Sequence, residues 1–191
     1  SGSDARLLAG GQSLMAMLNM RLLHPSLIID ISSLPDHNFI RCENNVVEIG
    51  CATTQRQFQS WAELSDKLPL LSQALPWIGH PQTRNKGTVC GSVAHADPSA
   101  ELPVCFAALE GVAMLYSSRG ERLLRWDELQ TGMLETACES DEMIRAIQFP
   151  VSETGTGYAF GEVAYRHGDF AIVSMAVLSK PQKTRMVVGG I

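Results

Sequence analysis

Two hairpin signals, one before and one after a helical region, constrain the fold most. Residues 39–51, FIRCENNVVEIGC, alternate apolar and polar positions around Glu43-Asn44-Asn45. Residues 112–126, VAMLYSSRGERLLRW, place a Ser-Arg-Gly turn between two further runs. Turn residues between such runs are typical of antiparallel strands. Because helices and strands are interspersed but hairpins are frequent, the pattern predicts a mixed α+β fold rather than a doubly wound parallel sheet.

Apolar periodicity and capping residues predict the other elements. Residues 6–25 form a short strand, a glycine turn and a helix that ends at Pro25, and residues 26–32 form a buried strand. The remaining predictions are a helix capped by Thr53 or Thr54 that contains Phe58 and Trp61, a helix that begins near Pro69, a helix in 99–111 with Gly111 as its C-cap, and a closing strand in 142–150.

Composition excludes several classes of protein. The chain has 191 residues, 45% hydrophobic and 18% charged, which is typical of a globular domain. Its net charge is −5 and no run of Lys or Arg occurs, which argues against a nucleic-acid or anionic-membrane partner. The apolar runs are too short for a transmembrane helix. The five cysteines are scattered singly, which indicates a reducing, cytoplasmic setting and no iron–sulfur cluster on this chain.

A glycine turn after the first strand is the first candidate binding feature. In LLAGGQSLM the strand runs into Gly10-Gly11, followed by Gln12, Ser13 and the start of a helix. Successive backbone N–H groups in such a turn can form a nest for a pyrophosphate. A tight strand-to-helix turn without a ligand is the alternative. The Rossmann and P-loop motifs, GxGxxG and GxxxxGK[ST], do not occur here.

The segment 84–101, RNKGTVCGSVAHADPSAE, is the second candidate. It combines Gly87 and Gly91 with the hydroxyls of Thr88 and Ser92. Two carboxylates, Asp97 and Glu101, then stand near a helix start, where they could cap that helix or accept hydrogen bonds from sugar hydroxyls of a cofactor.

Cys90, His95 and Asp97 also suggest a metal site or a nucleophile, but both readings are weak. A zinc site needs further ligands at recognisable spacing, and none is nearby. A Cys–His dyad needs hydrogen-bond contact, which sequence spacing does not impose here. The sequence therefore predicts neither a catalytic residue nor a metal site.

Four stretches together resemble a known family. They are LLAGGQSLMAMLNMRLLHPSLIIDIS, IGCATTQRQFQ, IGHPQTRNKGTVCGSVAHADPSAELP and YRHGDFAIVSMAV, within about residues 5–177. They resemble the flavin (medium) subunit of molybdenum hydroxylases of the carbon monoxide dehydrogenase and xanthine dehydrogenase type. The resemblance implies an α+β FAD-binding domain of the vanillyl-alcohol-oxidase (PCMH) type over 1–151. Its subdomains, about 1–50 and 51–151, would hold the flavin between them. Residues 158–191, after the junction SETGTG, would begin a C-terminal α+β domain.

The resemblance also implies roles for individual residues, matched by position. The first loop would wrap the pyrophosphate; it consists of Ala9, Gly10, Gly11, Gln12, Ser13 and Leu14. The second loop would contact the flavin; it consists of Gly87, Thr88, Val89, Cys90, Gly91 and Ser92. Asp97 and Glu101 would lie near the ribityl and ribose hydroxyls, and Ile144 would lie beside the flavin.

Cys90 departs from the family pattern, because it stands where the family usually has a glycine. The departure affects the expected backbone path and leaves a thiol as a candidate neighbour of the flavin. The resemblance implies that FAD is held non-covalently, as is characteristic of this branch of the flavoprotein superfamily. If Cys90 merely replaces glycine, Cys90→Gly should preserve or improve FAD binding.

The implied function is electron transfer within a larger complex. A large subunit would carry the molybdenum cofactor and a small subunit two 2Fe–2S clusters, with FAD on this chain passing electrons to NAD, dioxygen, a quinone or another carrier. The chain would then belong to a cytoplasmic hetero-oligomer. Two alternatives remain: a structural interaction subunit that has lost flavin, and a stand-alone flavin oxidase.

Overall fold

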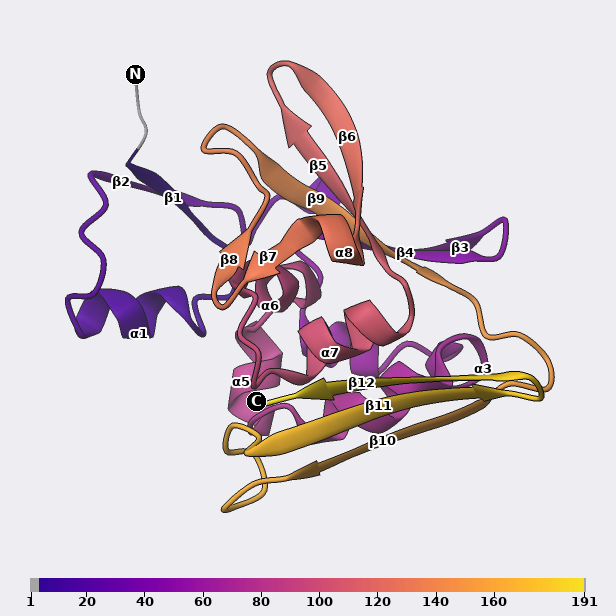
Figure 1. Ribbon diagram of the computed structural model, residues 1–191. Coiled ribbons are helices and arrows are strands. Elements are labelled where there is room, and N and C mark those ends of the chain that lie inside the picture. The colour runs from indigo at the N-terminus through magenta and orange to yellow at the C-terminus, as the bar shows by residue number, and fades with distance from the viewer. Residues whose placement is uncertain (1–3, 191) are drawn as a thin grey trace.

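The computed structural model describes residues 4–190 (Figure 1). The chain begins with strand β1 (Ala5–Leu8), helix α1 (Leu14–Asn19) and strand β2 (Leu27–Asp30). β1 and β2 pair in parallel and form a small two-stranded sheet at one side of the molecule. A 3-10 turn, η1 (Pro35–His37), leads from this unit into the main body.

A five-stranded antiparallel sheet forms the upper layer in Figure 1, with the order β3-β4-β9-β5-β6. Its strands are β3 (Ile40–Glu43), β4 (Val46–Gly50), β5 (Val112–Ser117), β6 (Gly120–Arg125) and β9 (Met143–Pro150). Both predicted hairpins are present. Asn44 and Asn45 have φ values of 50° and 60°, the backbone that a tight two-residue hairpin turn requires. The predicted α+β class is therefore confirmed.

Short helices fill the space below this sheet (Figure 1). They are α2 (Gln55–Gln59), α3 (Leu64–Lys67), α4 (Pro69–Ala74), η2 (Leu75–Trp77), α5 (Pro81–Lys86), α6 (Val89–His95), α7 (Glu101–Ala108) and α8 (Trp126–Leu129). Thr54 caps α2 through a capping box with Gln57, as the sequence predicts. The core lies between helices and sheet, where the rings of Phe106 and Phe149 meet edge to face at 6.1 Å.

A second antiparallel sheet covers the other side of the helices. It consists of β10 (Gly157–Val163), β11 (Val173–Lys180) and β12 (Lys183–Gly189) and contacts α4 and α7. The side chain of Gln73 in α4 fixes it by donating to the Tyr158 carbonyl at 3.2 Å and accepting from the Phe160 N–H at 3.3 Å. A small pair, β7 (Gln130–Gly132) and β8 (Glu135–Thr136), completes the fold.

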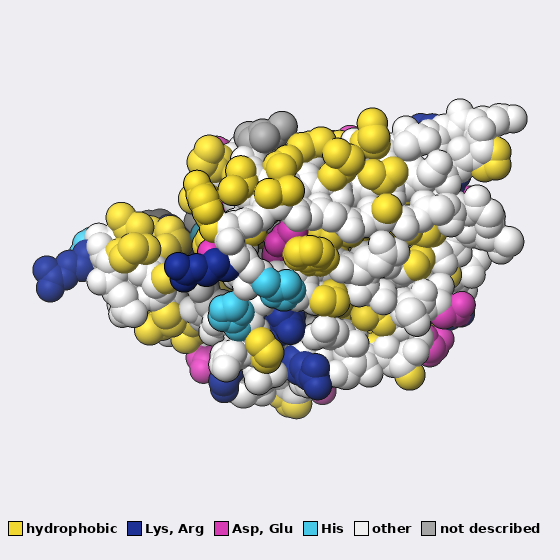
Figure 2. All heavy atoms as spheres, turned by 90° about the horizontal axis from the view of Figure 1, so that it is seen from below, with side chains coloured by type: hydrophobic (Ala, Val, Ile, Leu, Met, Phe, Trp, Pro, Cys, Tyr) yellow, Lys and Arg dark blue, Asp and Glu magenta, His cyan; other side chains and the backbone are white. Residues whose placement is uncertain are grey.

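The outward face of the β10–β12 sheet carries exposed apolar side chains. Val163, Met175, Met186 and Val188 are all exposed, and Figure 2 shows hydrophobic side chains gathered on the side of the molecule seen from below. Their neighbours in sequence point inward, so each strand alternates between the helices and the outer surface.

Three predicted details are wrong. The strand 26–32 was expected to be buried, but all four residues of β2 are exposed, because β2 pairs with β1 alone in a two-stranded sheet. The first helix ends at Asn19, well before Pro25, and Arg21 follows with φ 58°. Trp61 lies beyond the end of α2.

The end of α7 also differs from its prediction. The residue with left-handed backbone is Glu110, with φ 55°, rather than Gly111. Gly111 is needed for another reason. A Cβ built on it would lie 2.2 Å from a ring carbon of Phe106, so a side chain there would displace the aromatic core.

One strand pairing crosses the predicted subdomain boundary near residue 50. Strands β3 and β4 precede the expected subdomain boundary near residue 50, yet β4 pairs with β9 from the following part of the chain. A boundary before β3 suits this pairing better, and the division into units remains a prediction. Residues 152–156, within the predicted junction, connect β9 to β10.

Candidate functional site

The two glycine-containing loops, far apart in sequence, touch each other. A Cβ built on Gly10 would lie 2.1 Å from the Lys86 carbonyl oxygen and 2.6 Å from the Gly87 Cα. Such distances are far below van der Waals contact, so only glycine permits this approach. Gly11 has φ +70°, a left-handed conformation that turns the chain from β1 toward α1. The first loop therefore lies directly on the second.

The second loop continues into a helix that the sequence analysis did not predict. The Thr88 hydroxyl caps α6 by accepting a hydrogen bond from the Gly91 N–H at 3.0 Å. The Val89 N–H donates to the Thr53 carbonyl at 3.2 Å, which ties the loop to the residues before α2. Residues 88–92 are thus the first turn of a helix rather than an irregular cradle.

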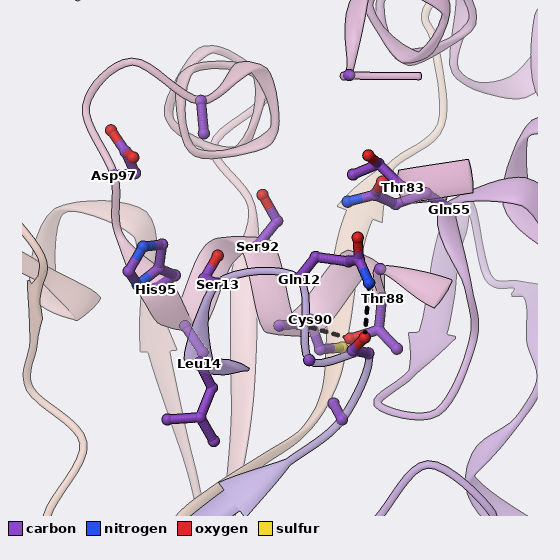
Figure 3. Close-up of a pocket in the computed structure, with 18 of the residues that line it drawn as sticks. Gln12, Ser13, Leu14, Gln55, Thr83, Thr88, Cys90, Ser92, His95 and Asp97 are labelled. Atoms are coloured by element: carbon purple, nitrogen blue, oxygen red, sulfur yellow. Dashed lines mark hydrogen bonds between the residues drawn. The ribbon is translucent and has the colours of Figure 1, made fainter. Parts of the chain in front are cut away.

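A pocket of about 680 Å³ opens between these loops. Fourteen of the fifteen predicted site residues line it; these are Ala9, Gly10, Gly11, Gln12, Ser13, Leu14, Gly87, Thr88, Cys90, Gly91, Ser92, Asp97, Glu101 and Ile144. The exception is Val89, which is fully buried in the core. Figure 3 shows the polar side chains of this set around the cavity, with Gln12 and Thr88 near its centre and Asp97 and His95 at one end.

A smaller pocket of about 330 Å³ shares the loop residues with the first. Ala9, Gly10, Gly11 and Thr88 line both pockets. The smaller one adds polar side chains, which are those of Asp30, Ser32, Thr54, Asn85 and Lys86. The meeting point of the two loops therefore borders both pockets.

Cys90 does not direct its thiol into open space. The side chain is 2% exposed, and the thiol donates to the Ile49 carbonyl at 3.5 Å. Burial raises the pKa of the Cys90 thiol well above its ordinary value, so the group stays protonated near neutral pH. The side chain that replaces the expected glycine is accommodated within the core.

The two predicted carboxylates differ in environment. Asp97 accepts a hydrogen bond from the Ser99 N–H at 2.9 Å. Glu101 begins α7 and is buried. Burial, with a smaller contribution from the negative charges of Glu162 and Asp97, raises the pKa of Glu101 to about 7, and Arg84 opposes this rise. Neither carboxylate caps α7, because no side chain accepts a hydrogen bond at its N-cap.

The structure adds wall residues that sequence reasoning missed. Gln55, Ile78, Gly79 and Thr83 come from α2 and from the region around α5. Gly168, Asp169 and Phe170 come from the loop between β10 and β11. This loop lies against η2, next to Ile78 in sequence, because His167 stacks on Trp77 with ring centroids 5.5 Å apart. The Thr54 capping signal pointed to α2 but could not show that Gln55 faces a cavity.

Residues 4–190 hold neither a metal-binding cluster nor a membrane-spanning helix. Within this range no group of three or more His, Cys, Asp or Glu side chains could hold a metal ion. Cys90, His95 and Asp97 all line the pocket but form no such cluster. No helix of this part of the chain has the length and apolar character needed to cross a membrane.

The fold and the pocket define an α+β domain in which two glycine loops meet at a site suited to a nucleotide cofactor. A family model described as "FAD binding domain in molybdopterin dehydrogenase" matches residues 1–152. The chain belongs to this family, which confirms the predicted FAD-binding-domain fold and the resemblance to molybdenum hydroxylase flavin subunits.

Individual relatives agree with this assignment. The chain is 42% identical over 171 residues to the 6-hydroxypseudooxynicotine dehydrogenase complex subunit alpha of Paenarthrobacter nicotinovorans, covering 90% of this chain and 58% of that protein. It is 38% identical to the caffeine dehydrogenase subunit beta of Pseudomonas sp. strain CBB1, covering 92% and 60%. A structure of carbon monoxide dehydrogenase from Hydrogenophaga pseudoflava superposes with a TM-score of 0.94 at 34% identity, covering 98% of this chain and 67% of that chain.

The residues present fit FAD. The loops approach so closely that a Cβ at Gly10 would collide with backbone, so no side chain stands between the two loops at this point. Ile78 and Ile144 supply apolar walls, and the buried Gln55 Oε1 has no hydrogen-bond partner among the described residues. A cofactor with a pyrophosphate, an apolar ring system and neutral polar groups matches each of these features.

Proposed function

We propose that this chain binds FAD non-covalently and acts as the electron-transferring flavoprotein part of a molybdenum-dependent hydroxylase complex. The observation that carries the proposal is the direct contact of the Gly10 and Gly87 loops beside a pocket lined by fourteen predicted residues. Membership of the FAD-binding family supports it.

The chain's own residues would bind and orient the cofactor. The backbone of Gly10 and Gly11 would hold the pyrophosphate, with the Thr88–Ser92 turn beside it, because the N–H groups of the two glycines are donors that no side chain obstructs. Ile78 and Ile144 would pack against the ring system and exclude water from one part of it. Asp97 and Glu101 would accept hydrogen bonds from hydroxyl groups of the cofactor. When bound, FAD supplies the capacity to accept and donate electrons.

The placement of the Cys90 thiol supports non-covalent binding. A thiol must be accessible and ionised to attach to another group, and Cys90 is buried, protonated and hydrogen-bonded to Ile49. We therefore assign Cys90 a packing role.

The partners and the electron acceptor are part of the proposal. One relative is named as a subunit of a dehydrogenase complex, and we propose that this chain joins a small subunit with 2Fe–2S clusters and a large subunit with the molybdenum cofactor. NAD, dioxygen or a quinone would then take electrons from FAD. The scattered cysteines favour a cytoplasmic location.

The test is flavin content and its release. The purified chain incubated with FAD should retain yellow flavin absorption after gel filtration, and acid precipitation should release all FAD into the supernatant. Flavin that stays in the precipitate would contradict non-covalent binding. A chain that cannot be loaded with FAD would favour the flavin-free interaction subunit, and activity without co-purifying subunits would favour the stand-alone oxidase.

A further inference from the structure

Gln55 holds a polar group in an unusual position on the pocket wall. It is the first residue of α2, and its backbone N–H donates to the Gly87 carbonyl at 2.8 Å. The residue is 4% exposed. Its side-chain Oε1 lies 3.2 Å from the position that a Cβ on Gly87 would occupy. Thus the amide lies immediately behind the point where the two glycine loops meet.

The Oε1 atom of Gln55 has no hydrogen-bond partner within residues 4–190. Buried polar side chains in folded proteins almost always have a partner, because leaving one unpaired is unfavourable by about 1–3 kcal/mol. An apolar side chain of similar size would avoid this penalty. Because Gln55 lines the pocket, a ligand bound there can supply a hydrogen-bond partner for its amide.

Thr83 stands beside Gln55 and shares the same wall. Its carbonyl accepts from the Gly87 N–H at 2.7 Å, so both residues are fixed to the second loop through backbone hydrogen bonds. Figure 3 shows the two side chains next to each other, at the opposite end of the view from Asp97 and His95. An amide and a hydroxyl together offer donors and acceptors without charge.

The chemistry of this pair selects a neutral ligand group. A phosphate has acceptor oxygens and negative charge, and the backbone N–H groups of the loops already suit it. The amide and hydroxyl instead suit a group that both donates and accepts hydrogen bonds. The flavin half of FAD has two such groups, the ribityl hydroxyls and the imide edge of its ring.

The position of the pair favours the flavin half over the adenosine half. Gln55, Thr83 and Ile78 line the larger pocket and are absent from the lining of the smaller one. The larger pocket has the volume and the apolar wall that a three-ring system needs.

We propose that Gln55, with Thr83 beside it, hydrogen-bonds the flavin half of FAD rather than its adenosine half. This assignment rests on the proposed function. Replacing Gln55 by Leu removes both the donor and the acceptor, but it also removes an unpartnered polar group from the free chain.

The experiment measures dissociation constants of FAD, riboflavin, lumiflavin and ADP for the wild-type chain and for Gln55→Leu, Thr83→Val and Gln182→Leu. Gln182 is exposed in the turn between β11 and β12 and provides the matched control. Gln55→Leu should weaken FAD and riboflavin about tenfold, as expected for one hydrogen bond of about 1.4 kcal/mol, and leave ADP unchanged. Thr83→Val should show a smaller loss of the same pattern.

Lumiflavin lacks the ribityl chain and identifies the flavin group involved. Weaker lumiflavin binding by Gln55→Leu would place the contact at the ring edge, and unchanged lumiflavin binding with weaker riboflavin binding would place it at the ribityl hydroxyls. The free Gln55→Leu chain should also melt about 2–4 °C higher, because an unpaired buried group is gone.

Two results would overturn the assignment. Weaker ADP binding with unchanged riboflavin binding would place Gln55 at the adenosine half. If Gln55→Leu leaves the affinity for all four ligands unchanged, or only lowers the melting temperature, then Gln55 stabilises the fold and does not contact the ligand. Failure of the wild-type chain to bind FAD is a separate outcome, and it would refute the proposed function itself.

Discussion

At the scale of single residues, the carboxyl of Glu101 is removed from water at the first position of α7. Burial is the main cause of its raised pKa, about 7 against an ordinary value of 4.5, and Glu162 and Asp97 add negative charge nearby. Between these two pH values the folded chain holds a proton that the unfolded chain has released. The free energy of unfolding therefore falls as pH rises through this window.

Glu101→Gln should remove this pH dependence. The wild-type free energy of unfolding should fall between pH 4.5 and pH 8, and that of the variant should not. Because one pKa unit corresponds to 1.36 kcal/mol, the difference between variant and wild type should grow by on the order of 2–3 kcal/mol over this range. Urea unfolding at both pH values measures the difference, with the exposed Glu43→Gln as the control. An equal offset of Glu101→Gln from wild type at the two pH values would contradict a buried, protonated Glu101.

Cys90 yields a prediction that separates packing from cofactor chemistry. Cys90→Gly should lower the free energy of unfolding by about 2 kcal/mol, since it removes a buried side chain and places glycine in α6. Cys90→Ala should lose about half as much. Both variants should keep FAD affinity within about twofold, measured by flavin fluorescence. Loss of FAD from a stably folded Cys90→Ala chain would instead assign the thiol a role at the flavin.

At the scale of elements, the contact between the β1–α1 loop and the α5–α6 loop decides whether the pocket exists. Gly10→Ala places a methyl group 2.1 Å from the Lys86 carbonyl oxygen and 2.6 Å from the Gly87 Cα. Both of these atoms belong to the backbone and cannot rotate away, so the loops must separate. The variant should lose bound FAD and about 1–3 kcal/mol of stability.

Gly161→Ala is the matched control for this change, because a Cβ there meets no heavy atom within 4 Å. Flavin absorption after gel filtration and urea unfolding measure both effects. A Gly10→Ala chain that retains FAD as Gly161→Ala does would mean that the loop contact is not needed for binding.

The elements also show what local sequence can predict. The hairpins, the capped α2 and the glycine turn depend on neighbouring residues, and each was predicted from sequence. The exposure of β2 depends on how many strands join its sheet, which is a long-range property. All the residues matched to the family except Val89 line one pocket, but the placement of Gln55, Thr83 and Phe170 depends on contacts between distant segments that no local pattern encodes.

At the scale of the whole molecule, the β10–β12 sheet and the pocket are physically connected. The β10–β11 loop supplies Gly168, Asp169 and Phe170 to the pocket wall. A Cβ on Gly168 would lie 2.6 Å from the His80 ring and 2.9 Å from the Gly79 carbonyl oxygen, so this loop lies directly on the turn before α5. Gln73 also ties the sheet to α4, through its two hydrogen bonds to β10. A ligand in the pocket should therefore stabilise the sheet as well.

Hydrogen exchange tests this coupling. At an FAD concentration 100 times the dissociation constant, binding adds about 2.7 kcal/mol to the stability of every segment that must unfold together with the pocket. The amides of β11 should then exchange about 100-fold more slowly with FAD, matching those of α6 and α7. Gln73→Leu, which removes both hydrogen bonds to β10, should reduce this protection in β10 and β11 but leave it in α6. If FAD slows exchange in α6 and α7 and leaves β11 unchanged in the wild-type chain, the sheet opens independently and the proposed coupling is absent.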